Sequence, residues 1–299
     1  AFRMTVLIDP ENVEGYVNLG MDLNSLGKKE EARTEFERAR ALRPNHVTAL
    51  SNLAVFAMDE GNLQEAERLL MAAATADPKA YNVYYNLGLL SLKLNDRAKA
   101  EKAFRETCAL KPDYAPAYYQ HARALLSLGR NDEALMALRQ SLQLDPDQTE
   151  ARRLLSGELI RRGLWTEVAQ ELTWLIEKGL ANKADLLNLG IALASSGRLP
   201  EAEATLRKAL EVDPQDETVR FNLANALLMQ DKSEEAAAAF SKYLQAKPDD
   251  VEARYRCGLA LAQLGKNPEA AVQFNEALRI DPNRKDAREE LAKLGHVTP

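Results

Sequence analysis

The chain has 299 residues, a formal net charge of −6 and a pI near 5.4. This acidic balance argues against nucleic acid or an anionic membrane as the main partner, because both attract a net basic surface. Hydrophobic residues make up 46% of the chain but aromatic residues only 6%, a composition typical of helices that pack through small side chains. We therefore expect an all-α protein.

The residue types that carry most enzyme chemistry are scarce. The two cysteines, Cys108 and Cys257, cannot build a disulfide framework or a four-cysteine metal site. The three histidines, His46, His121 and His296, give no nucleophile–base pair and no metal cluster. No apolar run reaches the roughly 18–20 residues that span a bilayer. We expect no enzymatic activity, cofactor, metal or membrane insertion; the compartment stays open, with a slight preference for the cytoplasm.

Residues 1–12, at the start of the chain, have the pattern of the second helix of a repeat whose first helix is missing. The first residue is alanine rather than methionine, which indicates processing or excision from a longer protein. Phe2, Val6 and Ile8 would then be only half covered. This half-repeat is accordingly a candidate surface for self-association into a homo-oligomer.

A 34-residue period governs residues 13–284. Prolines recur at this spacing, with Leu180 standing in register where one is absent: Pro10, Pro44, Pro78, Pro112, Pro146, Pro214, Pro248 and Pro282. Position 1, taken three residues after each proline, begins eight repeats at Val13, Val47, Tyr81, Ala115, Thr149, Lys183, Glu217 and Val251. A period of this length predicts a solenoid of helix-turn-helix units, each of which buries its apolar face against its neighbours.

Each repeat carries the signals of two helices. Positions 4, 7, 8 and 11 form an i, i+3, i+4, i+7 stripe on the first helix. Position 8 is always small, which we attribute to a close approach of two helix backbones. Position 15 is glycine in six repeats, and Asn95 or Asp231 in the others, as a left-handed helix cap requires. Position 20 is alanine in seven repeats and position 24 is always Phe or Leu, so a small residue meets a large one across the helix pair.

The fifth repeat departs from this pattern. It has Val168 at position 20 and Leu175 at position 27, it ends in Gly179-Leu180 instead of Asp-Pro, and it holds both tryptophans. Ordinary drift with compensating volumes explains these changes; a hinge or a partner contact is the alternative. Residues 285–299 have the pattern of a capping helix and a tail, because a terminal repeat needs a polar outer face.

The eight units resemble tetratricopeptide repeats, in having Trp, Tyr or Leu at position 4, Leu-Gly at 7 and 8, Ala at 20, Phe at 24 and Pro at 32. The resemblance covers residues 13–284. It implies a right-handed superhelix of helix pairs whose first helices line a concave groove, and a function as a protein-interaction scaffold that holds a partner peptide or segment in that groove.

Position 6 would face the groove, and it is rich in side-chain amides: Asn18, Asn52, Asn86, Gln120, Asn188 and Asn222, interrupted by Leu154 and Arg256. Asparagine disfavours a helix interior, whereas its amide can both donate to and accept from a peptide backbone. The column resembles the asparagine ladder in the repeat region of O-GlcNAc transferases. A structural role, with bonds to an adjacent helix, is the alternative.

Two further groups of residues are expected beside these amides. Position 5 supplies the aromatic anchors Tyr85, Tyr119, Phe221 and Tyr255. Between the two asparagine stretches, Arg123, Arg153 and Arg161 would converge on an anion, such as an acidic segment of the partner; pairing with Glu150 or Glu158 is the alternative. The carboxylate clamp of chaperone-binding tetratricopeptide domains is not supported, because no three consecutive repeats supply its lysines, asparagines and arginine.

Two other functions stay open. The array could recruit substrates for a larger, glycosyltransferase-like enzyme whose catalytic domain lies elsewhere, or it could be a self-assembling structural protein.

Overall fold

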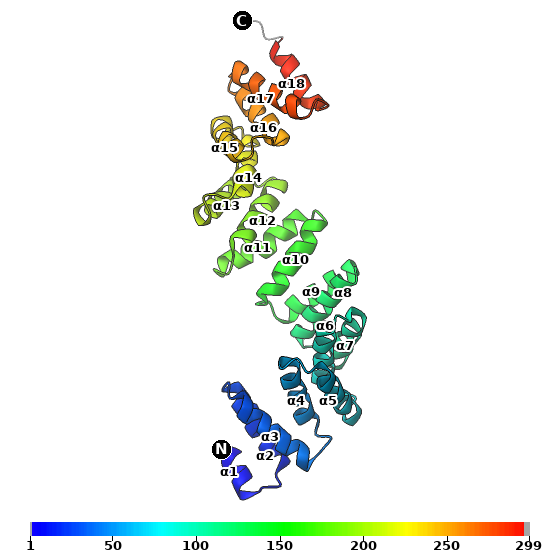
Figure 1. The fold of residues 1–299 in the computed structure, drawn as a ribbon. Coiled ribbons are helices and arrows are strands. Elements are labelled where there is room, and N and C mark those ends of the chain that lie inside the picture. Colours follow the sequence, from blue (N-terminus) through cyan, green and yellow to red (C-terminus); the bar gives the residue numbers. More distant parts are fainter. Residues whose placement is uncertain (1, 296–299) are drawn as a thin grey trace. The chain divides into compact units, whose positions relative to one another are not determined.

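A computed structural model describes residues 2–295 of the chain. This part forms eighteen helices in succession and contains no strand (Figure 1). The predicted all-α fold of paired helices is confirmed.

The helices alternate between the first and the second member of each repeat. The first helices are α2 (Val13–Ser25), α4 (Val47–Asp59), α6 (Tyr81–Lys93), α8 (Ala115–Ser127), α10 (Thr149–Arg161), α12 (Lys183–Ser195), α14 (Glu217–Leu228) and α16 (Val251–Gln263). The second helices are α3 (Lys29–Leu42), α5 (Leu63–Ala76), α7 (Arg97–Leu110), α9 (Asn131–Leu144), α11 (Trp165–Glu177), α13 (Leu199–Val212), α15 (Ser233–Ala246) and α17 (Asn267–Ile280). The half-repeat forms α1 (Phe2–Ile8), and α18 (Lys285–Gly295) follows the last repeat.

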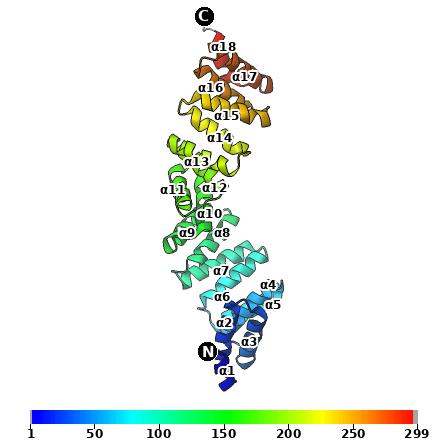
Figure 2. The same ribbon diagram turned by 90° about the vertical axis from the view of Figure 1, so that its left-hand side faces the viewer.

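Within each unit the helices pack mainly against their neighbours along the chain, as Figure 2 shows for successive helix pairs. The first helices of adjacent repeats are also in contact; examples are α4 with α6 and α14 with α16. Two compact units, which divide after Ala151 within α10, make up the chain. Unit 1 holds α1–α9 and unit 2 holds α11–α18. Contacts between nearest repeats therefore build each unit, as in other solenoids.

The turn between the two helices of a repeat is set by position 15. Gly27 has φ of 75° there, and Asn95 and Asp231 adopt φ of 59° and 57°. A left-handed residue lets the chain reverse while its N–H groups bond the last carbonyls of the first helix; Lys28 N, for example, donates to the Leu23 carbonyl at 2.9 Å. The sequence prediction of a left-handed cap is confirmed.

The core explains why position 8 is small. A Cβ on Gly88 would lie 2.5 Å from the ring of Phe104, and one on Gly190 would lie 2.5 Å from Cγ of Leu206. The group that excludes a side chain is thus the large residue at position 24 of the partner helix, not the helix backbone that we expected from the sequence. Packing of the large position-24 side chain onto the small position-8 residue brings the two helices of a repeat together.

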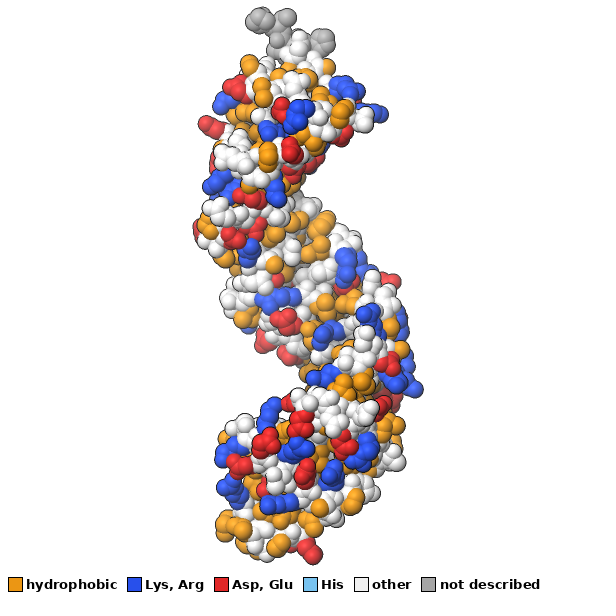
Figure 3. Space-filling model, in the orientation of Figure 1, with side chains coloured by type: hydrophobic (Ala, Val, Ile, Leu, Met, Phe, Trp, Pro, Cys, Tyr) orange, Lys and Arg blue, Asp and Glu red, His pale blue; other side chains and the backbone are white. Residues whose placement is uncertain are grey.

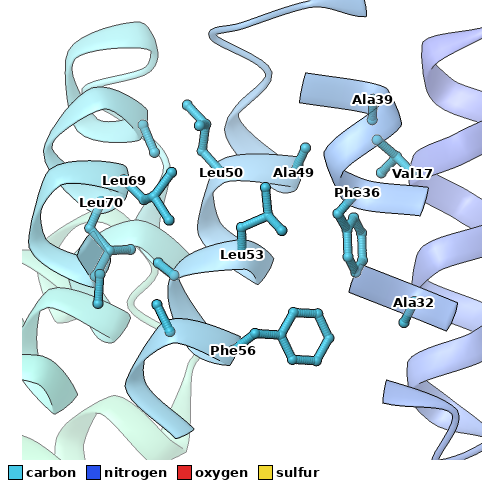
Figure 4. Packing of buried hydrophobic residues seen from close by; sticks show 14 of the residues in the cluster. Val17, Ala32, Phe36, Ala39, Ala49, Leu50, Leu53, Phe56, Leu69 and Leu70 are labelled. Atoms are coloured by element: carbon cyan, nitrogen blue, oxygen red, sulfur yellow. The ribbon is translucent and has the colours of Figure 1, made fainter. Parts of the chain in front are cut away.

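The large residue at position 24 is also the centre of the core between repeats. Figure 4 shows Phe36 pointing into the space between its own repeat and α4, toward Leu53 and Phe56. The rings of Phe36 and Phe56 are 6.2 Å apart, and Phe36 is completely buried. Burial of this kind, repeated in each helix pair, supplies most of the stability of a solenoid.

The fifth repeat keeps the fold by exchanging volumes. Val168 and Leu175 are completely buried, at position 20, where the other seven repeats have alanine, and at position 27, where four repeats have alanine. After α11 the chain turns through Gly179 at φ of 68°, and Asn182 and Asp185 form a reciprocal cap at the start of α12. The side chain of Trp174 lies under the guanidinium of Arg152, 4.0 Å from it. These contacts support compensated drift within unit 2.

The two end helices cover the repeats next to them. Phe2 and Val6 of α1 pack against the core of the first repeat, whereas Met4, Leu7 and Ile8 are exposed. Leu291 and Leu294 of α18 pack against the core of the eighth repeat. The predicted tail at 296–299, which includes His296, lies outside the described residues.

Candidate functional site

The position-6 amides all lie on first helices and are all partly exposed: Asn18, Asn52, Asn86 and Gln120 in unit 1, Asn188 and Asn222 in unit 2. Three of the asparagines use one N–H inside the protein. Asn52 and Asn222 donate to the carbonyls of Thr48 and Thr218 on their own helices, both at 2.8 Å. Asn86 donates to the Ser51 hydroxyl of the preceding repeat at 2.9 Å. Each of these amides keeps a second N–H and its carbonyl oxygen for another partner.

The side chains of Asn18 and Asn188 form no hydrogen bond within residues 2–295. The column is therefore structural in part, as the alternative interpretation of the sequence proposed, and in part unpartnered.

The aromatic residues at position 5 belong largely to the packing between helices. The ring of Tyr85 is 5.7 Å from Phe104 and 5.4 Å from Tyr114. Phe221 lies 6.0 Å from Phe240, and Tyr255 lies 5.9 Å from Phe274. Each ring thus covers the large position-24 residue of its own repeat, and only its remaining surface can meet a partner.

Four of the predicted residues come together in unit 1. Gln120 hydrogen-bonds to the Tyr85 hydroxyl and accepts from Arg123 at 2.9 Å. The guanidinium of Arg123 lies 5.7 Å from the ring centre of Tyr119. Burial raises the pKa of the Tyr85 hydroxyl, which the Gln120 bond and the Arg123 charge oppose. The cluster is a partly exposed patch on first helices α6 and α8, and its one arginine is exposed.

The other two predicted arginines have acidic partners. Arg153 Nε is 3.0 Å from the buried carboxylate of Asp185, and its Nη2 donates to the Leu180 carbonyl at 2.7 Å. Arg161 forms an ion pair with buried Glu158. Arg161 thus pairs with Glu158 of its own helix, as the alternative interpretation expects, whereas Arg153 links α10 to Asp185 of α12, a partner that the sequence did not indicate.

A hollow of about 210 Å³ opens on the first helices of unit 2, between α12, α14 and α16. Its polar lining includes Asn222, Asn225 and Arg256, and its apolar lining includes Ile191 and Met229. Gly190, which has no side chain, forms part of the wall. Asn222, an amide of the predicted column, and Arg256 thus line the same hollow. From the sequence, Arg256 was only a position where the column of amides is broken.

Asn225 is the residue of this hollow that sequence reasoning missed. It lies at position 9, and its Oδ1 is buried with no hydrogen-bond partner in the described protein. A buried acceptor without a donor costs free energy, so this atom favours a ligand that donates to it. The signal was available in the sequence, because Asn225 is the only amide among the eight position-9 residues.

Arg256 is held in place by a charged network. Its Nε is 2.5 Å from Glu252, whose second oxygen lies 2.6 Å from Arg284. Burial raises the pKa of Glu252, but the bonds from Arg284 and Arg256 outweigh this effect and hold its pKa below the ordinary value. Glu252 therefore stays ionised at neutral pH and orients the arginine beside the hollow.

The possible metal ligands and thiols of residues 2–295 form no cluster. No group of three His, Cys, Asp or Glu side chains within the described chain could hold a metal ion. Both cysteines are buried; burial raises the pKa of the Cys108 thiol to about 12 and also raises the pKa of Cys257. Such thiols are poor nucleophiles. Among the helices of residues 2–295, none is both long and apolar enough to cross a membrane.

Comparison with known families gives a consistent result. A family model described as tetratricopeptide repeat matches residues 17–81, 57–115, 158–217, 187–251 and 221–285, and a second model of the same description matches residues 115–148. A search of curated proteins finds no match.

Solved structures of the same fold are similar to this one. YrrB, described as a TPR protein with an unusual peptide-binding site, is 22% identical with a TM-score of 0.57; the match covers 65% of this chain and 99% of YrrB. The C-terminal part of a TPR repeat-containing protein from Cytophaga hutchinsonii is 16% identical with a TM-score of 0.58, covering 81% of this chain and 99% of that one. At these identities the likeness concerns the fold.

Proposed function

Because the chain belongs to the tetratricopeptide repeat family, we propose that it is a protein-interaction scaffold that binds a segment of a partner protein along its first helices. The observation that carries the proposal is the buried, unpartnered Oδ1 of Asn225 in the hollow between α12, α14 and α16. A folded chain satisfies nearly all of its buried polar atoms, so an unsatisfied acceptor beside an open hollow is suited to a donor on a ligand.

The chemistry of the hollow suits a peptide. A backbone N–H of the partner donates to Asn225 Oδ1, and a partner carbonyl accepts from the N–H of Asn222 that does not bond Thr218. One side chain of the partner fills the space beside Ile191 and Met229. Arg256 adds a positive charge at the rim, which favours an acidic residue in the segment. YrrB, which shares the fold, is described as having a peptide-binding site.

A double variant of the hollow tests the proposal. The wild-type chain, Asn222→Ala with Asn225→Ala, and Asn275→Ala as a matched control would be immobilised, and the proteins retained from a source lysate identified by mass spectrometry. Asn275 is exposed on second helix α17 of the same unit. We expect at least one partner to be lost from the double variant and retained by the control.

Equal retention by all three proteins would move the binding surface away from the hollow. Circular dichroism and thermal melting of the double variant serve as the second readout. A matching loss of stability would mean that the two amides are structural.

Self-association is the second candidate function, and the exposed face of α1 favours it. Met4, Leu7 and Ile8 are 60%, 72% and 78% exposed. Sedimentation of the wild-type chain and of Leu7→Glu would distinguish the two candidates, because only self-association predicts an oligomer that the substitution dissociates.

A further inference from the structure

A second hollow lies in unit 1, away from the position-6 column. It has a volume of about 620 Å³, and it opens between second helices α5 and α7 with first helix α6 as its floor. It has an apolar lining from Leu87 and Leu90 of α6, from Leu94 directly after α6, and from Met71 of α5. Met71 and Leu94 are 55% and 46% exposed. We use the word seam for a junction of three consecutive helices, in which a first helix lies between two second helices. The seam formed by α5, α6 and α7 is the second seam.

A small residue at position 11 contributes to the opening of the second seam, together with the lack of charged links across it that the neighbouring seams have; the first seam also has a small residue there, Ala57. Position 11 is leucine in six repeats, and five of these side chains, such as Leu125 and Leu227, are buried. In the third repeat position 11 is Ser91, whose hydroxyl donates to the Leu87 carbonyl at 2.7 Å. The serine leaves the volume of a leucine side chain unfilled above the floor.

The first seam, formed by α3, α4 and α5 one repeat earlier, has the same geometry but is crossed by charges. Arg33 of α3 forms an ion pair with Glu60 of α4, and Lys29 lies 2.8 Å from Asp59. The hollow there measures only about 160 Å³. Acidic and basic side chains are interspersed over this region in Figure 3.

The third seam, formed by α7, α8 and α9, is also closed by charges. Glu101 lies 3.1 Å from Arg130 and 3.3 Å from His121, and Arg97 donates to the Ser127 carbonyl at 3.0 Å. The second seam has none of these links. Within residues 2–295, no ion pair joins α5 to α6 or α7. Glu67 on the α5 wall of the second seam and Lys102 on its α7 wall have no ion-pair partner there.

From this contrast we propose that the second seam is a docking site for an amphipathic helix of a partner protein. The floor from Tyr84 to Leu94 is about 15 Å long, about three turns of a helix. The walls and floor are helices whose backbone groups are already bonded, so they cannot pair with an extended strand, whereas a helix satisfies its own backbone.

Charge complementarity specifies the docking helix further. Glu67 is at position 21, the same position as Glu101, which at the third seam is neutralised by Arg130. The partner therefore supplies a basic residue toward Glu67 and an acidic residue toward Lys102, one on each flank of an apolar stripe with i, i+4, i+7 spacing. The docked helix thus provides the counter-charges and the apolar volume that the chain itself provides at the neighbouring seams.

The test uses a synthetic helical peptide of about 18 residues, with leucines at i, i+4 and i+7, lysines on one flank and glutamates on the other. Its binding to the full chain is measured by fluorescence anisotropy. Three other probes are used in parallel: the same peptide with the two charged flanks exchanged, a version broken by proline, and laurate as a small amphiphile.

Two variants close the second seam by different means. Ser91→Leu restores the position-11 leucine of most repeats. Glu67→Arg with Leu94→Glu installs the charge pair that Arg33 and Glu60 form at the first seam. Leu264→Glu is the matched control, because Leu264 occupies the same repeat position as Leu94 in unit 2 and is 37% exposed. The double variant changes surface residues only, so the test remains decisive if Ser91→Leu folds poorly.

We expect the peptide to bind the wild-type chain and Leu264→Glu equally, and both closing variants at least about tenfold more weakly, since each removes the pocket for an anchor side chain. The flank-exchanged and proline-broken peptides should also bind more weakly. No binding to the wild-type chain, unchanged binding to the closing variants, equal binding of the flank-exchanged peptide, or saturation by laurate alone would each overturn the proposal.

Discussion

The first and second seams of unit 1 have the same three-helix geometry and opposite chemistry. The first is crossed by the Arg33–Glu60 and Lys29–Asp59 pairs, whereas the second presents Met71 and Leu94 to solvent. Neither difference disturbs the helix pairs, because the helix frame depends on positions 8, 20 and 24 and not on the seam residues. A repeat protein can therefore change the surface at one seam while its backbone stays the same.

The largest effect on stability should come from substitutions in the core below the seams. The first and second seams do not differ in this core. Phe36 and Phe104 are both completely buried at position 24. Replacing either by alanine should lower the free energy of unfolding by about 3–5 kcal/mol, since each substitution leaves a cavity. Urea denaturation followed by circular dichroism measures both. A clearly smaller loss for Phe104→Ala would mean that the open second seam reaches into the core.

A leucine at position 11 should raise the free energy of unfolding at the second seam and lower it at the first. Ser91→Leu adds apolar volume to an open hollow and should raise the free energy of unfolding by about 1 kcal/mol. Ala57→Leu makes the same change at the first seam, where Ala57 adjoins Arg33, Glu37 and Glu60, and overpacking should destabilise the chain by about 1–3 kcal/mol. Thermal melts of the two variants would show shifts in opposite directions. Stabilisation by both would contradict a closed first seam.

The smallest effect concerns pH at the third seam, where His121 occupies the position of Leu87 in the second. Burial lowers the pKa of His121, Glu101 raises it and Arg105 and Arg130 lower it; the net pKa lies below the ordinary 6.5. The unfolded chain therefore binds the proton more readily, so stability falls as the pH drops below 6.5.

His121→Leu introduces the leucine that most repeats have at this position. It should reduce the dependence of stability on pH. Melting temperatures of wild type and variant between about pH 7 and about pH 5.5 would measure this effect. Parallel curves for the two proteins would exclude a contribution from His121.

The helices that carry the position-6 amides could be predicted from the sequence, but the bonds that these and the other predicted site residues make inside the protein could not. The 34-residue register placed Asn52, Asn86 and Asn222 on first helices, where the structure has them. It could not indicate that Asn86 donates to Ser51 or that Arg153 pairs with Asp185. These bonds join residues 35 and 32 positions apart, and they depend on distances between helices that no local pattern contains.

The sequence by itself determined the helix pairs and their turns, because capping, left-handed residues and the spacing of small and large side chains act within a few residues of the chain. The tertiary structure decided which polar groups are used up inside the protein and which are left for a partner. Within residues 2–295, it left Asn225 Oδ1 without a donor and left α5 with no ion pair to α6 or α7 at the second seam. Both outcomes depend on side chains that meet from three helices, and only the packed structure fixes the distances between them.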